Sequence, residues 1–144
     1  MYKFSKSSLD ALQTCHEDLQ VIMKQGIIVS DVDFGISEGY RSPEIQFMYF
    51  QQGKSKIDGI QRKGKHNYRP SMACDYFAFI DGEASWDPEH ITYLSGMFRA
   101  ISEMYLHRGL IKHRVRWGGN WDMDGIILID QTFDDRPHIE LINP

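Results

Sequence analysis

The chain has 144 residues, of which 42% are hydrophobic and 25% charged, a composition typical of a single soluble globular domain. Its net charge of −4 gives no overall basic character, which argues against a nucleic-acid partner. There is no run of about 20 apolar residues for a membrane span and no signal peptide. We therefore expect synthesis in the cytoplasm without membrane insertion.

The chain alternates between segments with apolar residues at helical spacing and short strand-like runs. In chain order, the predicted elements are a helix capped by Ser7 or Ser8 that ends near Gly26, a strand at 32–37, a helix at 43–52 capped by Ser42, a strand at 72–80, a turn at Asp81-Gly82, a helix from Pro88 to Leu106, and strands at 114–117 and 138–142. A long polar loop at 53–71 is a candidate functional segment. These elements predict an α+β fold with a small, mostly antiparallel sheet and flanking helices.

Asp75 is a carboxylate inside an otherwise apolar strand, between Cys74 and Tyr76. Burying a carboxylate without compensation is costly. Strand alternation places it on the same face as Ala73 and Phe77. Taken alone, the position is better explained by a partner arginine or by a solvated sheet edge than by a functional role.

Two histidines and a second carboxylate extend this pattern. His66 lies in the polar loop nine residues before Asp75, and His138 opens the last predicted strand. Two histidines and one carboxylate form a common ligand set for catalytic zinc, with one position left for water. Asp135, three residues before His138, is placed to accept a proton from such a water. The spacing alone is a weak signal because these residues come from separate parts of the chain.

The wider pattern resembles the D-alanyl-D-alanine carboxypeptidase and L-alanyl-D-glutamate endopeptidase family of zinc enzymes, which includes small phage endolysins. The similar segments are Glu38-Gly39-Tyr40-Arg41-Ser42 followed by Gln46, Ala73-Cys74-Asp75, Trp117-Gly118-Gly119-Asn120-Trp121, and Asp135-Arg136-Pro137-His138-Ile139-Glu140. The resemblance implies a hedgehog/D-Ala-D-Ala-peptidase-like fold and a single zinc peptidase domain over residues 1–144, with no separate cell-wall-binding domain.

By the same resemblance, His66, Asp75 and His138 bind one zinc ion per chain, and Asp135 is the catalytic base. Arg41 matches a family arginine that binds a substrate carboxylate or stabilises the transition state, two tasks that suit the paired donors of a guanidinium.

Three departures from the family motif lie just before the first expected ligand or between the first two. Gly64 replaces the usual serine, the spacing from His66 to Asp75 is two residues longer, and Arg69-Pro70-Ser71 stands where the motif has glycine. The insertion either bulges away from the metal, reshapes the substrate groove or weakens the site.

The function implied is that of a zinc-dependent peptidoglycan peptidase, a phage endolysin that cleaves the L-alanyl-D-glutamate bond of wall stem peptides. Such an enzyme is made in the host cytoplasm and acts at the bacterial cell wall after release. One alternative is a D-alanyl-D-alanine carboxypeptidase or dipeptidase. Another is a non-catalytic, metal-stabilised wall-binding domain, although such a domain would not need Asp135.

Several further residues have lesser expected roles. Glu140 is a candidate to orient a metal ligand or an arginine, or is merely structural. The candidates for substrate binding are Tyr40, Gln46, Trp117 and Trp121.

The remaining candidates are set aside. Asp122–Gly125 with Asp130 hints at a calcium loop, but the pattern lacks the terminal glutamate of an EF-hand, so we interpret it as a solvated turn. The other residues set aside are Cys15 and Cys74 as buried, reduced thiols, His90 as part of a helix start, His107 and His113 as exposed residues near a helix end, and His16.

Overall fold

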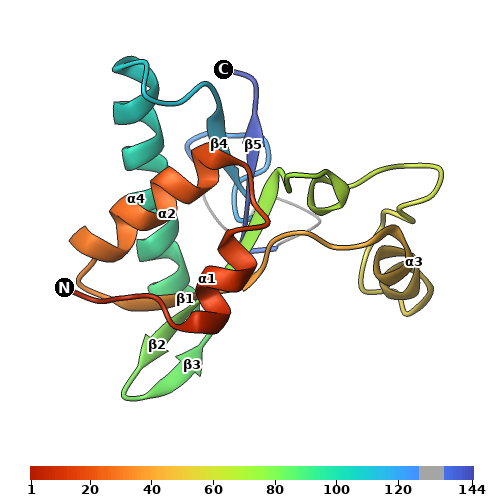
Figure 1. Cartoon of the computed structure of the whole chain (residues 1–144), viewed down its shortest axis with the longest axis horizontal. Helices are drawn as coiled ribbons and strands as arrows, with labels where there is room; N and C mark the ends of the chain where they lie inside the picture. Colours follow the sequence, from red (N-terminus) through yellow and green to blue (C-terminus); the bar gives the residue numbers. More distant parts are fainter. Residues whose placement is uncertain (127–134) are drawn as a thin grey trace.

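The computed structural model describes residues 1–126 and 135–144, and it has the expected α+β architecture (Figure 1). In Figure 1, helices α2 and α4 cross on one side of the sheet, and α3 lies apart from the other helices. The elements are α1 (Lys6–Leu12), α2 (Glu17–Val29), β1 (Asp33–Glu38), α3 (Pro43–Gln51), a 3-10 turn η1 (Lys65–Asn67), β2 (Ala73–Ile80), β3 (Glu83–Ser85), α4 (Pro88–His107), β4 (Arg114–Trp117) and β5 (His138–Ile142).

The strands form one sheet in the order β1-β2-β5-β4, with β3 paired to β2. All of its strand pairings are antiparallel. The register places Asp75 of β2 directly opposite His138 of β5, and Arg116 of β4 opposite Glu140. The polar residues that interrupt these strands therefore meet near the middle of the sheet.

The hydrophobic core lies between the sheet and the helices α2 and α4. Phe98 of α4 contacts the rings of Phe34 and Tyr76 edge-on, with both pairs of centroids 5.1 Å apart. Leu19 and Ile22 of α2 are fully buried in the same cluster. In the part of the chain that the structure describes, no helix combines the length and apolar character needed to cross a membrane.

The prediction of one long helix before Gly26 is wrong, because the structure has two helices there. The backbone between them pairs with a distant segment instead. The N–H of His16 donates to the carbonyl of Ser71, and the N–H of Ser71 donates to the carbonyl of Thr14, both at 2.8 Å. The first helix is capped by Ser5 rather than by Ser7 or Ser8. Gly26 lies inside α2, since one glycine costs a helix only about 1 kcal/mol.

Elsewhere the predicted elements are confirmed to within about two residues. Strand β3 was not predicted, since three residues are too few to show alternation. It follows the predicted turn at Asp81-Gly82, where both residues have positive φ (51° and 84°) as a tight hairpin requires. Cys15 and Cys74 are buried and free, as expected.

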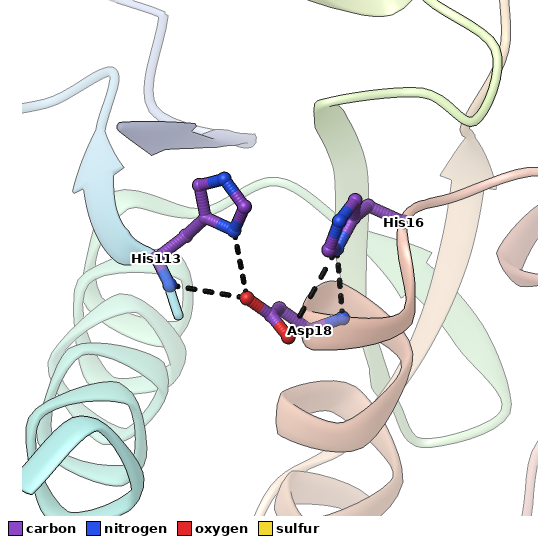
Figure 2. Close-up of side chains that lie close together, drawn as sticks. All are labelled: His16, Asp18 and His113. Carbon is purple, nitrogen blue, oxygen red and sulfur yellow. Dashed lines mark hydrogen bonds and ion pairs between the residues drawn. The ribbon is translucent and has the colours of Figure 1, made fainter. Parts of the chain in front are cut away.

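A hydrogen-bonded cluster of His16, Asp18 and His113 joins the start of α2 to the segment before β4 (Figure 2). The Asp18 carboxylate accepts hydrogen bonds from the backbone N–H groups of Lys112 and His113 and from Nδ1 of His113, at 3.0, 3.1 and 2.8 Å. Nδ1 of His16 accepts from the backbone N–H of Asp18 and thereby caps the helix. The expectation that His113 is exposed was therefore wrong, because this bond holds its ring partly buried.

Burial by itself would raise the pKa of Asp18, but the hydrogen bonds from the His113 side chain and the Lys112 amide outweigh it, and the pKa is lowered. A carboxyl whose pKa is lowered by folding stabilises the protein above the pKa of the unfolded chain, about 3.9. That stabilisation is lost as the pH falls through the lower, folded value.

We expect Asp18→Asn to reduce the free energy of unfolding at pH 7 by about 1–3 kcal/mol, because it weakens a buried, charge-assisted network. The deficit should shrink as the pH falls below about 4, because Asp18 becomes protonated first in the unfolded chain and then, at a lower pH, in the folded parent. Urea unfolding over a pH series measures both effects. Asp10→Asn is the control, since Asp10 is exposed and pairs only with Lys6 on the surface. Equal effects of the two substitutions at pH 7 would contradict the role of Asp18.

Candidate metal centre

The structure brings His66, Asp75 and His138 together from η1, β2 and β5. Nε2 of His66 lies 3.1 Å from Oδ1 of Asp75 and 3.2 Å from Nδ1 of His138. The same Asp75 oxygen lies 2.9 Å from Nδ1 of His138. Three ligand atoms thus face one another at the floor of a cleft.

The ring of His66 is oriented by the backbone of Gly39. Its Nδ1 lies 2.6 Å from the Gly39 carbonyl, and because a carbonyl only accepts, this nitrogen carries the proton. A side chain at Gly39 is sterically excluded, since a Cβ atom would lie 2.3 Å from Oγ1 of Thr14 and 2.6 Å from the carbonyl of Ala11. The close packing of this turn therefore fixes the carbonyl that sets the tautomer of His66.

The ring of His138 is oriented from its other side by Glu140. Nε2 of His138 lies 3.6 Å from Oε2 of Glu140, and Glu140 in turn pairs with Arg116. With a cation among the three facing atoms, the proton of this imidazole would stay on Nε2 beside Glu140, and the lone pair of Nδ1 would face the cation.

With these tautomers, the three facing atoms are all acceptors, because each imidazole presents a lone pair and the carboxylate has no proton of its own. Acceptors about 3 Å apart repel one another unless a proton or a cation lies among them. Without a metal, burial would lower the pKa of His138, but hydrogen bonds to Asp75 and Glu140 prevail and raise it to about 10. Burial would also raise the pKa of Asp75, but the charges of and hydrogen bonds from His66 and His138 lower it instead. The donor set thus fits a divalent cation.

Asp135 lies beside this cluster, with Oδ2 3.9 Å from Nδ1 of His138. Its backbone N–H donates to the carbonyl of Gly118 at 3.0 Å, and its carbonyl would clash at 1.9 Å with a Cβ atom on Gly118. The carbonyl of the next residue, Arg136, accepts hydrogen bonds from Trp117 and Tyr76. These contacts hold the backbone at Asp135 from β2, from β4 and from Gly118, which follows β4.

The electrostatic environment of Asp135 differs from that of Asp75. Its burial raises the pKa, the nearby His138 opposes that shift, and the charge of Asp75 adds to it. The two carboxylates are thus pushed in opposite directions, with Asp75 kept ionised and Asp135 more basic than an ordinary aspartate.

Arg41 lies on the opposite side of the cluster from the strand that carries His138. Its Nε donates to Glu38 at 2.9 Å, its NH1 donates to Oε1 of Gln46 at 3.0 Å, and its NH2 lies 3.7 Å from Oδ2 of Asp75. The ring of Tyr49 lies 4.9 Å from the guanidinium carbon. The guanidinium is thus held in a defined orientation at the metal cluster.

A cleft of about 620 Å³ opens above these residues and is lined by Arg41, Asp135 and the three clustered residues. Of the four residues expected to bind substrate, Gln46 and Trp121 line it, whereas Tyr40 and Trp117 do not. Trp117 is buried in the core, and Tyr40 lies against Arg69.

The cluster of His16, Asp18 and His113 has the same residue types but a different pattern of hydrogen bonds (Figure 2). The lone pair of His16 Nδ1 already accepts from a backbone N–H, and three N–H groups already donate to Asp18. All of these hydrogen bonds are satisfied without a cation. We therefore assign this cluster to structure, whereas the first cluster has the donor set of a candidate metal site.

Where the structure describes the candidate calcium loop, it fits the interpretation as a solvated turn. Asp122 and Asp124 make local turn contacts, and Asp130 lies outside the described residues. The sequence did not single out Gly39 or Gly118, which act through their backbone, or Arg116, which supports Glu140. In the sequence, Gly39 and Gly118 stood out only as members of segments that resemble the family. Arg116 stood out only as part of a predicted strand.

Comparisons with known proteins place this geometry in a family. The sequence model of the family described as phage L-alanyl-D-glutamate peptidase matches residues 1–142. The chain therefore belongs to this family.

Individual relatives agree in fold and in sequence. The chain is 24% identical to the L-alanyl-D-glutamate peptidase of Escherichia phage T5, over 98% of both chains. It is 28% identical to the peptidoglycan L-alanyl-D-glutamate endopeptidase CwlK of Bacillus subtilis, over 77% of this chain but only 62% of that protein. The crystal structure of the Serratia marcescens L-Ala D-Glu endopeptidase ChiX superposes with a TM-score of 0.75 and 26% identity, covering 97% of this chain and 90% of ChiX. The match to ChiX confirms the fold.

We expect one divalent transition-metal ion to bind per chain, because only the first cluster presents three unpaired acceptors. His66→Ala and His138→Ala should lose that ion, and the matched control His113→Ala should keep it. Metal content after loading with Zn²⁺ and desalting provides the measurement. Two ions per chain, one of them lost in His113→Ala, would show that the assignment of the clusters is wrong.

Proposed function

We propose that this member of the phage L-alanyl-D-glutamate peptidase family is a zinc-dependent peptidase of bacterial peptidoglycan that cleaves the L-alanyl-D-glutamate bond of stem peptides. The observation that carries the proposal is the set of three acceptors from His66, Asp75 and His138, with Asp135 beside them in an open cleft. The names of the three relatives supply the choice of bond. Its site of action is the bacterial cell wall.

Zinc suits the donor set because two imidazoles and one carboxylate are its common protein ligands in hydrolytic enzymes. When bound, zinc supplies Lewis acidity that polarises a carbonyl and makes water acidic near neutral pH.

Asp135 is the catalytic base in this proposal. Its carboxylate lies 3.9 Å from Nδ1 of His138, beside the three facing atoms, where it could accept a proton from a water at the cluster. Its raised pKa, caused chiefly by burial, makes it a better proton acceptor than an ordinary aspartate. The backbone contacts to Gly118 hold it there without using its side-chain oxygens.

Arg41 binds the carboxylate of the substrate or the oxyanion that develops at the scissile carbonyl. Glu38 and Gln46 hold the guanidinium in place before substrate arrives, so little side-chain freedom is lost on binding. Its contact with Asp75 also places it within the same charge network as the metal ligands.

Glu140 is a positioning residue. It is 5% exposed, lies between Arg116 and Nε2 of His138, and keeps the lone pair of Nδ1 directed at the cluster. Trp121 covers the outer side of this network, with its ring 5.5 Å from that of His138 and 5.4 Å from the guanidinium carbon of Arg116.

The direct test is digestion of isolated peptidoglycan by the purified protein, with and without a chelator, followed by mass spectrometry of the products. New C-terminal L-alanine and new N-terminal D-glutamate are the expected ends, and a chelator should prevent their release. Release of D-alanine instead would move the cleaved bond to the end of the stem peptide. Zinc binding without any cleavage would reject the enzymatic proposal.

Asp135→Asn separates catalysis from metal binding. The amide cannot accept the proton, so we expect turnover to fall by about 10²–10⁴-fold while zinc stays bound. His138→Ala should lose both the metal and the activity. Turnover and metal content, measured on the same preparations, distinguish the two. Near-normal turnover by Asp135→Asn would show that another group is the base.

A further inference from the structure

The cleft is strongly basic, although the chain as a whole is acidic. Its lining includes seven of the 16 lysines and arginines but only three of the 20 acidic residues. The basic residues of the lining are Arg41, Lys54, Lys56, Arg62, Lys63, Lys65 and Arg116. We call Lys54, Arg62 and Lys63, which come from the loop between α3 and η1, the basic rim.

The acidic residues of the cleft do not neutralise the basic rim. Asp75 belongs to the metal cluster, Glu140 is paired with Arg116, and Asp135 lies beside His138. Within residues 1–126 and 135–144, Lys54, Arg62 and Lys63 form no ion pair with a carboxylate. The positive charge of the rim is therefore available to a ligand.

The single acidic residue inside the loop, Asp58, has a different task. Its Oδ1 accepts from the backbone N–H groups of Ile60, Gln61 and Arg62 at 2.9, 3.0 and 3.0 Å. These bonds shape the turn that carries Arg62, and Asp58 does not line the cleft. The carboxylate of this loop thus shapes the backbone.

Each of the rim lysines, Lys54 and Lys63, lies over an aromatic ring. Nζ of Lys63 is 4.3 Å from the ring centre of Tyr68, and Nζ of Lys54 is 5.7 Å from that of Tyr49. A ring face attracts an ammonium group without neutralising its charge. These contacts restrain the two side chains at the cleft.

The buried Gln46 ties the rim to the site arginine. Its Nε2 donates to Oγ of Ser55 at 2.8 Å and to the carbonyl of Ile57 at 2.9 Å, while its Oε1 accepts from Arg41. A displacement of the loop would therefore also alter the hydrogen bond that holds Arg41. The rim and the metal cluster belong to one continuous binding surface.

We propose that the basic rim binds the free carboxylates of an acidic peptide on the glutamate side of the scissile bond. The inference rests on the proposed function and adds the recognition of charge to it. In an L-alanyl-D-glutamate bond the carboxyl of alanine is consumed, whereas glutamate has two carboxyls and needs only one to continue the chain. The free carboxylates therefore lie on the leaving side. A cleft of about 620 Å³ suits a short peptide rather than a broad polyanion.

The test compares three forms of N-acetyl-L-alanyl-γ-D-glutamyl-D-alanine, in which both, one or neither of the two free carboxyls is converted to an amide. Binding is measured by calorimetry in low salt with zinc present, using Asp135→Asn as the parent so that turnover does not interfere. We expect affinity to rise by about threefold for each carboxylate, the size of a partly exposed ion pair.

Adding Lys54→Gln and Lys63→Gln to this parent should flatten the dependence on peptide charge and leave the affinity for the doubly amidated peptide unchanged. Lys24→Gln is the control, because Lys24 is an exposed residue of α2 that donates a hydrogen bond to Gln20 and does not line the cleft. Raising the salt concentration should reduce the charge dependence of the parent more than that of the double variant.

Equal affinities of the parent for the three peptides, or an unchanged dependence on charge in the double variant, would overturn the basic rim. Cleavage of the same peptides by the wild-type protein is scored separately. Charge-dependent binding without cleavage would support the rim and count against the proposed function. Cleavage with charge-independent binding would do the reverse.

Discussion

The antiparallel register between β2 and β5 is the constraint on which the site depends. It places Asp75 directly opposite His138, while the neighbouring pairings bring Glu38 opposite Asp75 and Arg116 opposite Glu140. A shift of one residue would turn every side chain of a strand to the other face of the sheet. The buried positions of β2, which alternate with Asp75 and pack against α4, make such a shift costly, so the hydrophobic core also determines the positions of Asp75 and His138.

The two clusters of histidine and aspartate show why residue types alone do not define a metal site. In the first, the Gly39 carbonyl and Glu140 take the outer imidazole protons, which leaves unpaired acceptors facing Asp75. In the second, backbone N–H groups already satisfy Asp18 and His16. The difference comes from the backbone around each cluster, which supplies a proton acceptor in one case and proton donors in the other.

The groups that line the cleft are held in place in two different ways. Asp135 is held through backbone contacts to Gly118 and through the neighbouring carbonyl of Arg136, so its carboxylate oxygens remain available. The basic rim lies on a loop, but Gln46 anchors that loop to Arg41. A carboxylate held just before β5 and an anchored basic loop are the arrangement that the proposed cleavage of an acidic peptide requires.

The sequence by itself determined the α+β class, most of the elements and the residue types of the site. Local signals sufficed for these, such as Ser42-Pro43 at the start of α3 and an aspartate inside an apolar strand. The resemblance of short motifs to a known family marked His66 and His138, which are 72 residues apart. The sequence could not show the break between α1 and α2, because that break depends on backbone pairing with the distant Ser71.

Only the tertiary structure decided which polar groups satisfy one another. The hydrogen bond from His113 to Asp18 joins residues 95 positions apart. The unprotonated Nε2 of His66 depends on the Gly39 carbonyl, which lies close to Nδ1 of the same ring. Neither leaves a local pattern, because a backbone carbonyl is present at every residue and acquires a specific role only through packing. Protonation, and with it the distinction between a structural and a metal-binding cluster, is therefore a property of the folded chain.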